Sequence, residues 1–199
     1  MFSFNEYLYF IAAYLIGSVP FGIIVAKVAG VGDITKQGSG NIGATNVARV
    51  GGKKLGTATF ILDFLKCYIP TTIYIDQFGY GDGALICAFL IVIGHILPVF
   101  NRFRGGKGVA CGFGALLALN PYVCIISLLI WLACFLTTRI SSASALLSFA
   151  LMPFVLFMVN TSASTNLMLF ALALSAVIYI RHIENIKRLL GGNEKGFKQ

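Results

Sequence analysis

A short polar stretch between two apolar segments contains the residue types best suited to binding a phosphate group. It reads Gly38-Ser39-Gly40-Asn41-Ile42-Gly43-Ala44-Thr45-Asn46, and Arg49 follows it. Glycine lets backbone amides approach an anion closely, and successive N–H groups in such a turn form a concavity that suits phosphate. The hydroxyl and amide side chains add neutral donors, and Arg49 adds a fixed positive fork. The stretch predicts a phosphate-binding loop, although a glycine-rich segment can also be a simple tight turn.

Two further motifs each allow two interpretations. Lys107, in Gly105-Gly106-Lys107-Gly108, is either a basic anchor at the membrane surface or a second phosphate-binding group. His182 and Asn185, in Arg181-His182-Ile183-Glu184-Asn185, are three residues apart and would share one face of a helix. They are either structural or part of an active site. His95 precedes Pro98 at the end of an apolar segment, and we expect it to orient loops beside a bound phosphate.

Three common types of site fit the sequence poorly. Gly38, Gly40 and Gly43 match the dinucleotide-binding fingerprint, with Asp63 20 residues further on. That fingerprint requires a soluble βαβ unit, whereas apolar segments flank these glycines. The loop around Lys107 lacks the upstream glycine and the following Ser or Thr of a P-loop. No metal is required, because the polar loops contain no acidic cluster.

The composition indicates an integral membrane protein. Of 199 residues, 58% are hydrophobic and 11% are charged, and the mean hydropathy is +0.87. Soluble domains have about 25% charged residues. The long apolar runs predict an all-α domain over residues 1–199 instead of a β-barrel. The net charge of +8 indicates loops beside anionic headgroups, not a nucleic-acid partner.

The apolar segments predict seven transmembrane helices, since about 20 residues span a bilayer. The first three spans are Tyr7 to Ala26, Leu55 to Ile75, and Gly83 to Phe100. Gly108 to Thr138 is divided at Asn120-Pro121 into a short fourth span and a fifth. Ile140 to Ile180 is divided by the polar run 160–166 into the sixth and seventh. The predicted connections include a long polar loop from Lys27 to Lys54 and a basic tail from Arg181 to Gln199.

The distribution of charge sets the predicted orientation. With the N-terminus outside and seven crossings, the outer segments contain only Glu6, Asp76 and Asp82 as charged residues. The basic residues of the inner segments are Lys27, Lys36, Arg49, Lys53, Lys54, Arg102, Arg104, Lys107, Arg139, Arg181, Lys187, Arg188, Lys195 and Lys198. This asymmetry agrees with the positive-inside rule and predicts a cytoplasmic C-terminus. All the unusual polar motifs then lie on the inner side of the membrane.

Asp63 and Lys66 are charged residues inside the second predicted span. They are three residues apart and can pair on one helix face. Such residues are costly in a bilayer, so they either have a buried function or form an ion pair that locks helices together, which we favour. The five cysteines form no CxxC pair and are expected to be small buried thiols.

The sequence resembles the bacterial acyl-phosphate:glycerol-3-phosphate acyltransferase family, the PlsY type, over nearly its whole length. The motifs that carry the resemblance are Ser18-Val19-Pro20, Gly38 to Asn46, Leu62-Asp63 with Lys66, Gly94-His95 with Pro98 and Phe100, Gly105 to Ala110, and Arg181-His182 with Glu184-Asn185. Cys67 and Cys111 replace the glycine and threonine that we expect at these positions. Both are small and affect helix packing more than chemistry.

The resemblance implies a multi-pass enzyme of the bacterial cytoplasmic (inner) membrane with a cytoplasmic active site. Its substrates would be acyl phosphate and glycerol 3-phosphate, and its products lysophosphatidic acid and phosphate. It would use no cofactor, and its partners would be membrane lipid and the enzyme that forms acyl phosphate. By match, Ser39, His182 and Asn185 would be catalytic. The residues assigned to substrate and phosphate binding are Gly38, Gly40, Asn41, Thr45, Asn46, Arg49, Lys107 and His95.

Ser39 has two possible roles: it is either a covalent nucleophile or a hydrogen-bond donor. We favour the donor, because acyl phosphate is already activated and its phosphate leaves readily. His182 or a phosphate oxygen of the substrate would accept the proton of the glycerol hydroxyl. A transporter of organic phosphate and a non-catalytic scaffold remain alternatives. A transporter should have polar groups across the whole membrane, whereas these motifs gather on one side.

Overall fold

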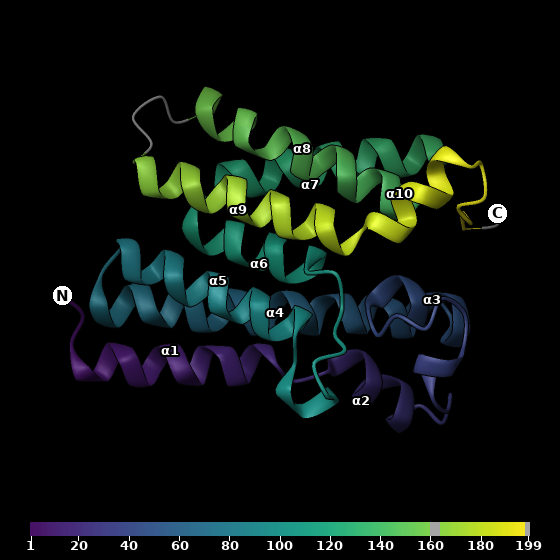
Figure 1. Ribbon diagram of the computed structural model, residues 1–199, viewed down its shortest axis with the longest axis horizontal. Coiled ribbons are helices and arrows are strands. Elements are labelled where there is room, and N and C mark those ends of the chain that lie inside the picture. Colours follow the sequence, from purple (N-terminus) through teal and green to yellow (C-terminus); the bar gives the residue numbers. More distant parts are fainter. Residues whose placement is uncertain (160–163, 198–199) are drawn as a thin grey trace. The chain divides into compact units, whose positions relative to one another are not determined.

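The computed structural model describes residues 1–159 and 164–197, and these residues form helices joined by loops, with no strand among them (Figure 1). They divide into two compact units, Met1–Leu119 and Asn120–Gln199. Part of the polar run predicted to separate the last two spans, 160–163, lies outside the described residues, as does Lys198.

The first unit is built around the long helix α4, Lys53–Phe78. Its other helices are α1 (Phe4–Gly17), α2 (Phe21–Val28), η1 (Ile34–Lys36), α3 (Ala44–Gly51), α5 (Asp82–Ile96), η2 (Val99–Asn101) and α6 (Val109–Leu119). Helices α5 and α6 both contact α4, α1 packs on α5, and α3 packs on α4 (Figure 1). Gly17 lies against the backbone of Ile91, and Gly94 lies against that of Tyr14, which lets α1 and α5 approach closely.

The first predicted span is bent, as its Gly-Ser-Val-Pro sequence suggested. Helix α1 ends at Gly17, α2 begins at Phe21, and their axes differ by 42°. Pro20 has no backbone N–H to continue the helix. The Ile23 N–H, which would reach the Val19 carbonyl in a continuous helix, instead donates to the Pro20 carbonyl at 3.0 Å. The break therefore leaves backbone carbonyls near Val19 available to other donors.

The prediction of one polar loop from Lys27 to Lys54 is wrong. Helix α2 continues to Val28, and η1 and α3 follow before α4 begins at Lys53. These short helices fold because apolar side chains line their inner face, where a small core forms from Ala26, Ile34, Ile42 and Val47. The candidate phosphate-binding stretch is thus part loop and part helix.

The second unit contains helices α7 (Pro121–Thr138), α8 (Ser141–Val159), α9 (Thr165–Arg181) and α10 (Ile183–Leu190). The division at Asn120-Pro121 is confirmed: the Asn120 side chain accepts from the Val123 N–H at 3.1 Å, and Pro121 opens α7. Helix α8 packs on α7 and α9. Side-chain hydroxyls join these helices, since Ser148 donates to the Ser127 carbonyl and Ser175 to the Phe149 carbonyl, each at 2.6 Å.

Within residues 1–159 and 164–197, four segments are long and apolar enough to cross a membrane: Lys53–Phe78, Asp82–Asn101, Pro121–Thr138 and Ser141–Val159. The pairs α1–α2 and α9–α10, bent by 42° and 62°, would bring the number to six if each is one span. Helix α6 is apolar but has only 11 residues, about 16 Å at 1.5 Å per residue. It matches the short fourth span that the sequence predicts, while the count of seven stays a prediction.

Candidate active site

The loop before α3 is shaped by the side chain of Asn46. This side chain is 1% exposed. Its oxygen accepts from the Ser39 N–H at 2.8 Å, and its amide nitrogen donates to the carbonyls of Ile34 and Gln37, each at 3.1 Å. Asn46 was assigned to phosphate binding by sequence, but the structure places its amide on the loop backbone. It holds the glycine-rich loop in shape.

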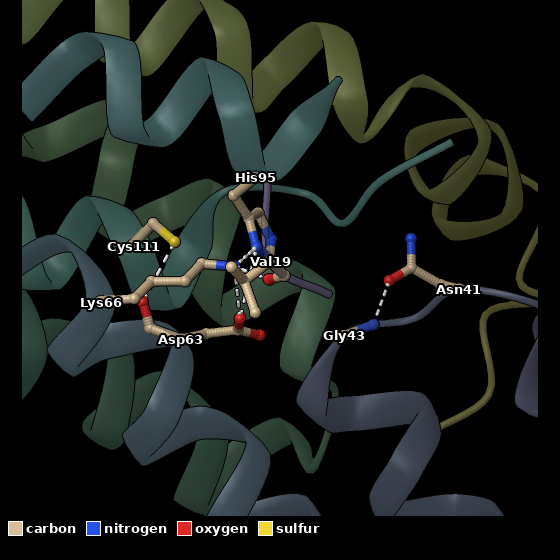
Figure 2. A network of polar contacts seen from close by, with 7 residues as sticks. All are labelled: Val19, Asn41, Gly43, Asp63, Lys66, His95 and Cys111. Atoms are coloured by element: carbon tan, nitrogen blue, oxygen red, sulfur yellow. Dashed lines mark hydrogen bonds and ion pairs between the residues drawn. The ribbon is translucent and has the colours of Figure 1, made fainter. Parts of the chain in front are cut away.

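The two flanking glycines are required by the backbone conformation of this loop. Gly38 and Gly40 have φ angles of 60° and 69°, in the left-handed region that favours glycine. Ser39 lies between them and is exposed. The Asn41 side chain accepts from the Gly43 N–H at 2.8 Å and so closes the next turn (Figure 2). The loop presents Ser39 outward on a backbone held by two asparagines.

Helix α3 follows this loop directly and begins at Ala44. Thr45 is half-buried and Arg49 is exposed. They are four residues apart and therefore lie on one face of the helix. The first amides of a helix have no partner within it and favour anions. Sequence reasoning found the residues of this segment but not the helix that arranges them.

The second glycine-rich loop lies against the end of α5. The Gly106 N–H donates to the His95 carbonyl at 3.1 Å. A methyl group added to Gly105 would collide with the backbone of His95 and Ile96, and one added to Gly106 would collide with the His95 imidazole. Both glycines are buried, whereas Lys107 is half-buried. The position of His95 thus fixes the backbone that carries Lys107.

A buried network of charged and polar groups lies beneath this loop (Figure 2). Lys66 Nζ lies 2.7 Å from Asp63 Oδ1, 2.8 Å from the Val19 carbonyl oxygen and 3.0 Å from His95 Nδ1. The side chains of Lys66, Asp63 and His95 are 2%, 3% and 5% exposed. The predicted ion pair is confirmed. Its connection to His95 was not apparent from the sequence, because the two residues are 29 positions apart.

The Lys66 ammonium donates hydrogen bonds to the Val19 carbonyl and to His95, and it forms an ion pair with Asp63. Because an ammonium only donates, His95 Nδ1 accepts, and the ring proton of a neutral His95 is on Nε2. Asp63, His95 and Cys111 together offer three possible metal ligands whose donor atoms lie within 4.8 Å of one another. The Lys66 ammonium lies 2.7 Å from the Asp63 carboxylate and 3.0 Å from His95 Nδ1, so a lysine side chain supplies positive charge to this cluster.

In the second unit, His182 lies at the bend between α9 and α10 and is 2% exposed. His182 Nδ1 lies 2.8 Å from the Ile178 carbonyl oxygen. A carbonyl can only accept, so Nδ1 carries the proton and Nε2 of the neutral ring has a lone pair. This tautomer suits a residue that accepts a proton during a reaction.

Asn185 is 5% exposed and is held by Glu194, which lies beyond the end of α10. Glu194 Oε1 accepts from Asn185 Nδ2 at 2.6 Å and from Ser142 Oγ at 2.7 Å, and Oε2 accepts from Arg188 Nε at 2.6 Å. Burial alone would raise the pKa of Glu194, but these hydrogen bonds outweigh it and lower the pKa. Sequence reasoning missed Glu194, for which the available signal was an acid among the basic residues of the tail, beyond the end of α10.

Comparison with known proteins decides the family. The model of the family described as glycerol-3-phosphate acyltransferase matches residues 7–192. The chain belongs to this family. The glycerol-3-phosphate acyltransferases of Agrobacterium fabrum and Aquifex aeolicus are 43% and 44% identical to it, over 94% of the chain and 89% and 96% of their own lengths.

Two solved structures agree with this acyltransferase along almost all of both chains. Both are described as PlsY (YgiH), an integral membrane glycerol 3-phosphate acyltransferase, in a glycerol 3-phosphate form and a lysophosphatidic acid form. Each is 40% identical and covers 98% of this chain and 96% of its own, with TM-scores of 0.92 and 0.88. With the apolar helices described above, this likeness shows that the acyltransferase is a multi-pass membrane protein.

Proposed function

We propose that this acyltransferase moves a fatty acyl group from acyl phosphate to the 1-hydroxyl of sn-glycerol 3-phosphate. The observation that carries the proposal is the construction of the first unit. Two glycine-rich loops, one presenting Ser39 and the other Lys107, each have a backbone fixed by buried polar groups. Both substrates contain phosphate, and rigid donors of this kind suit a phosphate group.

The proposed reaction is a direct transfer. The 1-hydroxyl oxygen of glycerol 3-phosphate forms an ester bond with the carbonyl carbon of the acyl phosphate. The bond from that carbon to the phosphate oxygen breaks, and inorganic phosphate leaves. The hydroxyl proton passes to His182 Nε2 or to a phosphate oxygen. Ser39 donates a hydrogen bond instead of forming an acyl-enzyme, because phosphate is already a good leaving group.

Each unit has its own proposed residues. In the first unit, Arg49, Thr45 and Lys107 bind phosphate, and the amides of Gly38, Gly40 and Asn41 line the loop around Ser39. Asn46 supports the backbone of that loop, and His95 supports the backbone of the loop around Lys107. In the second unit, Asn185 orients the reacting groups beside His182, within reach of the proton that moves. The N–H groups and cations would neutralise negative charge that grows on the departing phosphate.

We also propose seven crossings of the bacterial inner membrane, with the N-terminus outside and the C-terminus in the cytoplasm. The concentration of Lys and Arg in alternate connections supports this topology. The enzyme that forms acyl phosphate would be a partner, since it supplies the acyl donor. Protease protection of tags at the two ends of the chain tests the topology. Equal accessibility of both tags from one side would contradict it.

A paired assay tests the function. Purified protein in liposomes receives acyl phosphate and glycerol 3-phosphate, without coenzyme A or carrier protein, and both lysophosphatidic acid and glycerol 3-phosphate uptake are measured. We expect one lysophosphatidic acid for each phosphate released. Uptake of glycerol 3-phosphate without acylated product would contradict the proposal and favour a transporter.

A further inference from the structure

We propose that Lys66 and His95 are positioning residues that hold the two phosphate-binding loops in register with each other. This inference rests on the proposed function and deepens it. In this proposal neither side chain contacts substrate, so His95 has a supporting role in place of the phosphate contact that the resemblance implies. They act through the backbone on which Ser39 and Lys107 are carried.

The Lys66 ammonium contacts residues from three segments of the first unit. Asp63 lies on the same helix, α4, and its carboxylate balances the charge. Because both residues belong to α4, this contact alone does not connect α4 to another helix. The ammonium also donates hydrogen bonds to the Val19 carbonyl, at the α1–α2 break, and to His95, near the end of α5. One buried ammonium therefore fixes three separate segments to one another (Figure 2).

His95 is connected to Lys107 through Gly106, the residue that precedes Lys107. The His95 carbonyl accepts from Gly106 at 3.1 Å, and the imidazole packs so closely on Gly106 that no side chain would fit there. A rotation of the imidazole away from Lys66 would therefore push on the glycine backbone next to Lys107. The bond from Lys66 to Nδ1 prevents that rotation.

Val19 is connected to the loop around Ser39 through the start of α2. Helix α2 begins two residues after Val19, and its Gly22 lies directly against the Ile42 carbonyl. Ile42 belongs to the glycine-rich loop and is buried. A shift of the α1–α2 break would therefore displace this loop through Gly22. The Lys66 bond to Val19 holds the break in place, so both loops depend on the same ammonium.

Lys66→Met tests this inference directly, because methionine keeps the length of the side chain but has no ammonium. With full-length protein in nanodiscs, we expect the KM for glycerol 3-phosphate to rise at least about tenfold, and by more than kcat falls. We also expect faster hydrogen exchange at the Gly106 amide. A folded variant with wild-type KM and wild-type exchange would overturn the proposal.

Since Lys66→Met leaves the Asp63 carboxylate buried without its cation, stability must be separated from positioning. The double variant Asp63→Asn/Lys66→Met removes both charges and should regain much of the lost thermal stability. It should keep the raised KM, because Val19 and His95 still lack the donor. Recovery of both stability and KM would show that the ion pair only supports folding. Asp63→Asn alone keeps the ammonium and should change KM less than Lys66→Met.

A matched pair at His95 completes the test. Asn has an oxygen near the place of Nδ1 and can accept from Lys66, whereas Leu cannot. We expect His95→Asn to keep KM and Gly106 exchange closer to wild type than His95→Leu does. Equal losses in both variants would contradict positioning through Nδ1. If the wild type forms no lysophosphatidic acid, the proposed function fails, while exchange at Gly106 still tests the network by itself.

Discussion

The two units hold their candidate residues by different means. In the first, the backbone is shaped by glycines pressed against buried side chains, and a buried ion pair lies beneath one loop. In the second, the bend between α9 and α10 places His182, and the tail carboxylate of Glu194 holds Asn185. The first arrangement leaves no space for added atoms. The second depends on one negative charge contributed by a short folded tail.

Because of this difference, the candidate residues of the two units should respond to different kinds of substitution. Added volume should damage the first unit, because close-packed glycines have no room to relax. Loss of charge should damage the second, because one carboxylate accepts three hydrogen bonds there. Variants that add volume in the first unit or remove a charge in the second test this difference.

The largest effect is expected for Gly106→Ala. Its methyl group would collide with the His95 imidazole and displace Lys107. A displacement of about 1 Å can cost about a hundredfold in rate, which is the loss of turnover we expect. Gly81→Ala is the control, since Gly81 has open space around it and a φ of 173°, which any residue adopts. Comparable rates for the two variants would mean that the loop around Lys107 is not rigid.

A smaller loss is expected for Glu194→Gln in the second unit. The carboxylate accepts hydrogen bonds from Asn185, Ser142 and Arg188, and the amide cannot accept all of them equally well. We expect a loss of about 2 kcal/mol in unfolding free energy and a matching loss of activity. Glu184→Gln is the matched control, because Glu184 forms an exposed ion pair with Lys187 at 2.8 Å. Such a pair contributes about 0.5 kcal/mol or less to stability. Equal losses in Glu194→Gln and Glu184→Gln would contradict the proposed role of Glu194.

The mildest perturbation is acidification. Hydrogen bonding lowers the pKa of Glu194 in the folded protein, so its contribution to stability is complete above the unfolded pKa of about 4.3. It is lost as pH falls through the lower, folded pKa. Trp131, the single tryptophan, stacks on Phe135 at 4.9 Å, and Phe135 packs against Phe197 of the tail at 5.8 Å. Trp131 fluorescence should therefore stay constant from neutral pH until this acidic range. A transition near pH 6.5, where histidine titrates, would contradict the assignment.

Much of the fold could be predicted because prolines and the lengths of apolar runs determine where nearby helices begin and end. The bend near Pro20, the division at Asn120-Pro121 and the Asp63–Lys66 pair all follow from residues close together in the sequence. The short helix α3 could not be predicted this way. It is stabilised by packing on α4 and by Val47 in the small core, not by its own length.

The candidate site was predictable in its residue types but not in its supports. Glycine density and basic side chains indicated phosphate binding. Asn46 was assigned to the ligand, and its hydrogen bonds to the loop backbone were not predicted. Glu194 was missed because its three partners, Arg188, Asn185 and Ser142, are 6, 9 and 52 residues away, and only the folding of the tail brings them together. Residue types reveal what a side chain can bind, whereas long-range folding decides which partner it finds.

The most direct test of the account is the initial rate of lysophosphatidic acid formation by variants from both units. Ser39→Ala, Lys107→Ala and His182→Ala should each lose at least about tenfold in turnover, or about 1.4 kcal/mol of barrier stabilisation. Lys187→Ala, on the exposed surface of α10, should keep the wild-type rate. Wild-type rates in all three site variants, with acyl phosphate and glycerol 3-phosphate as the only substrates, would contradict the claim that the two units serve one phosphate-handling reaction.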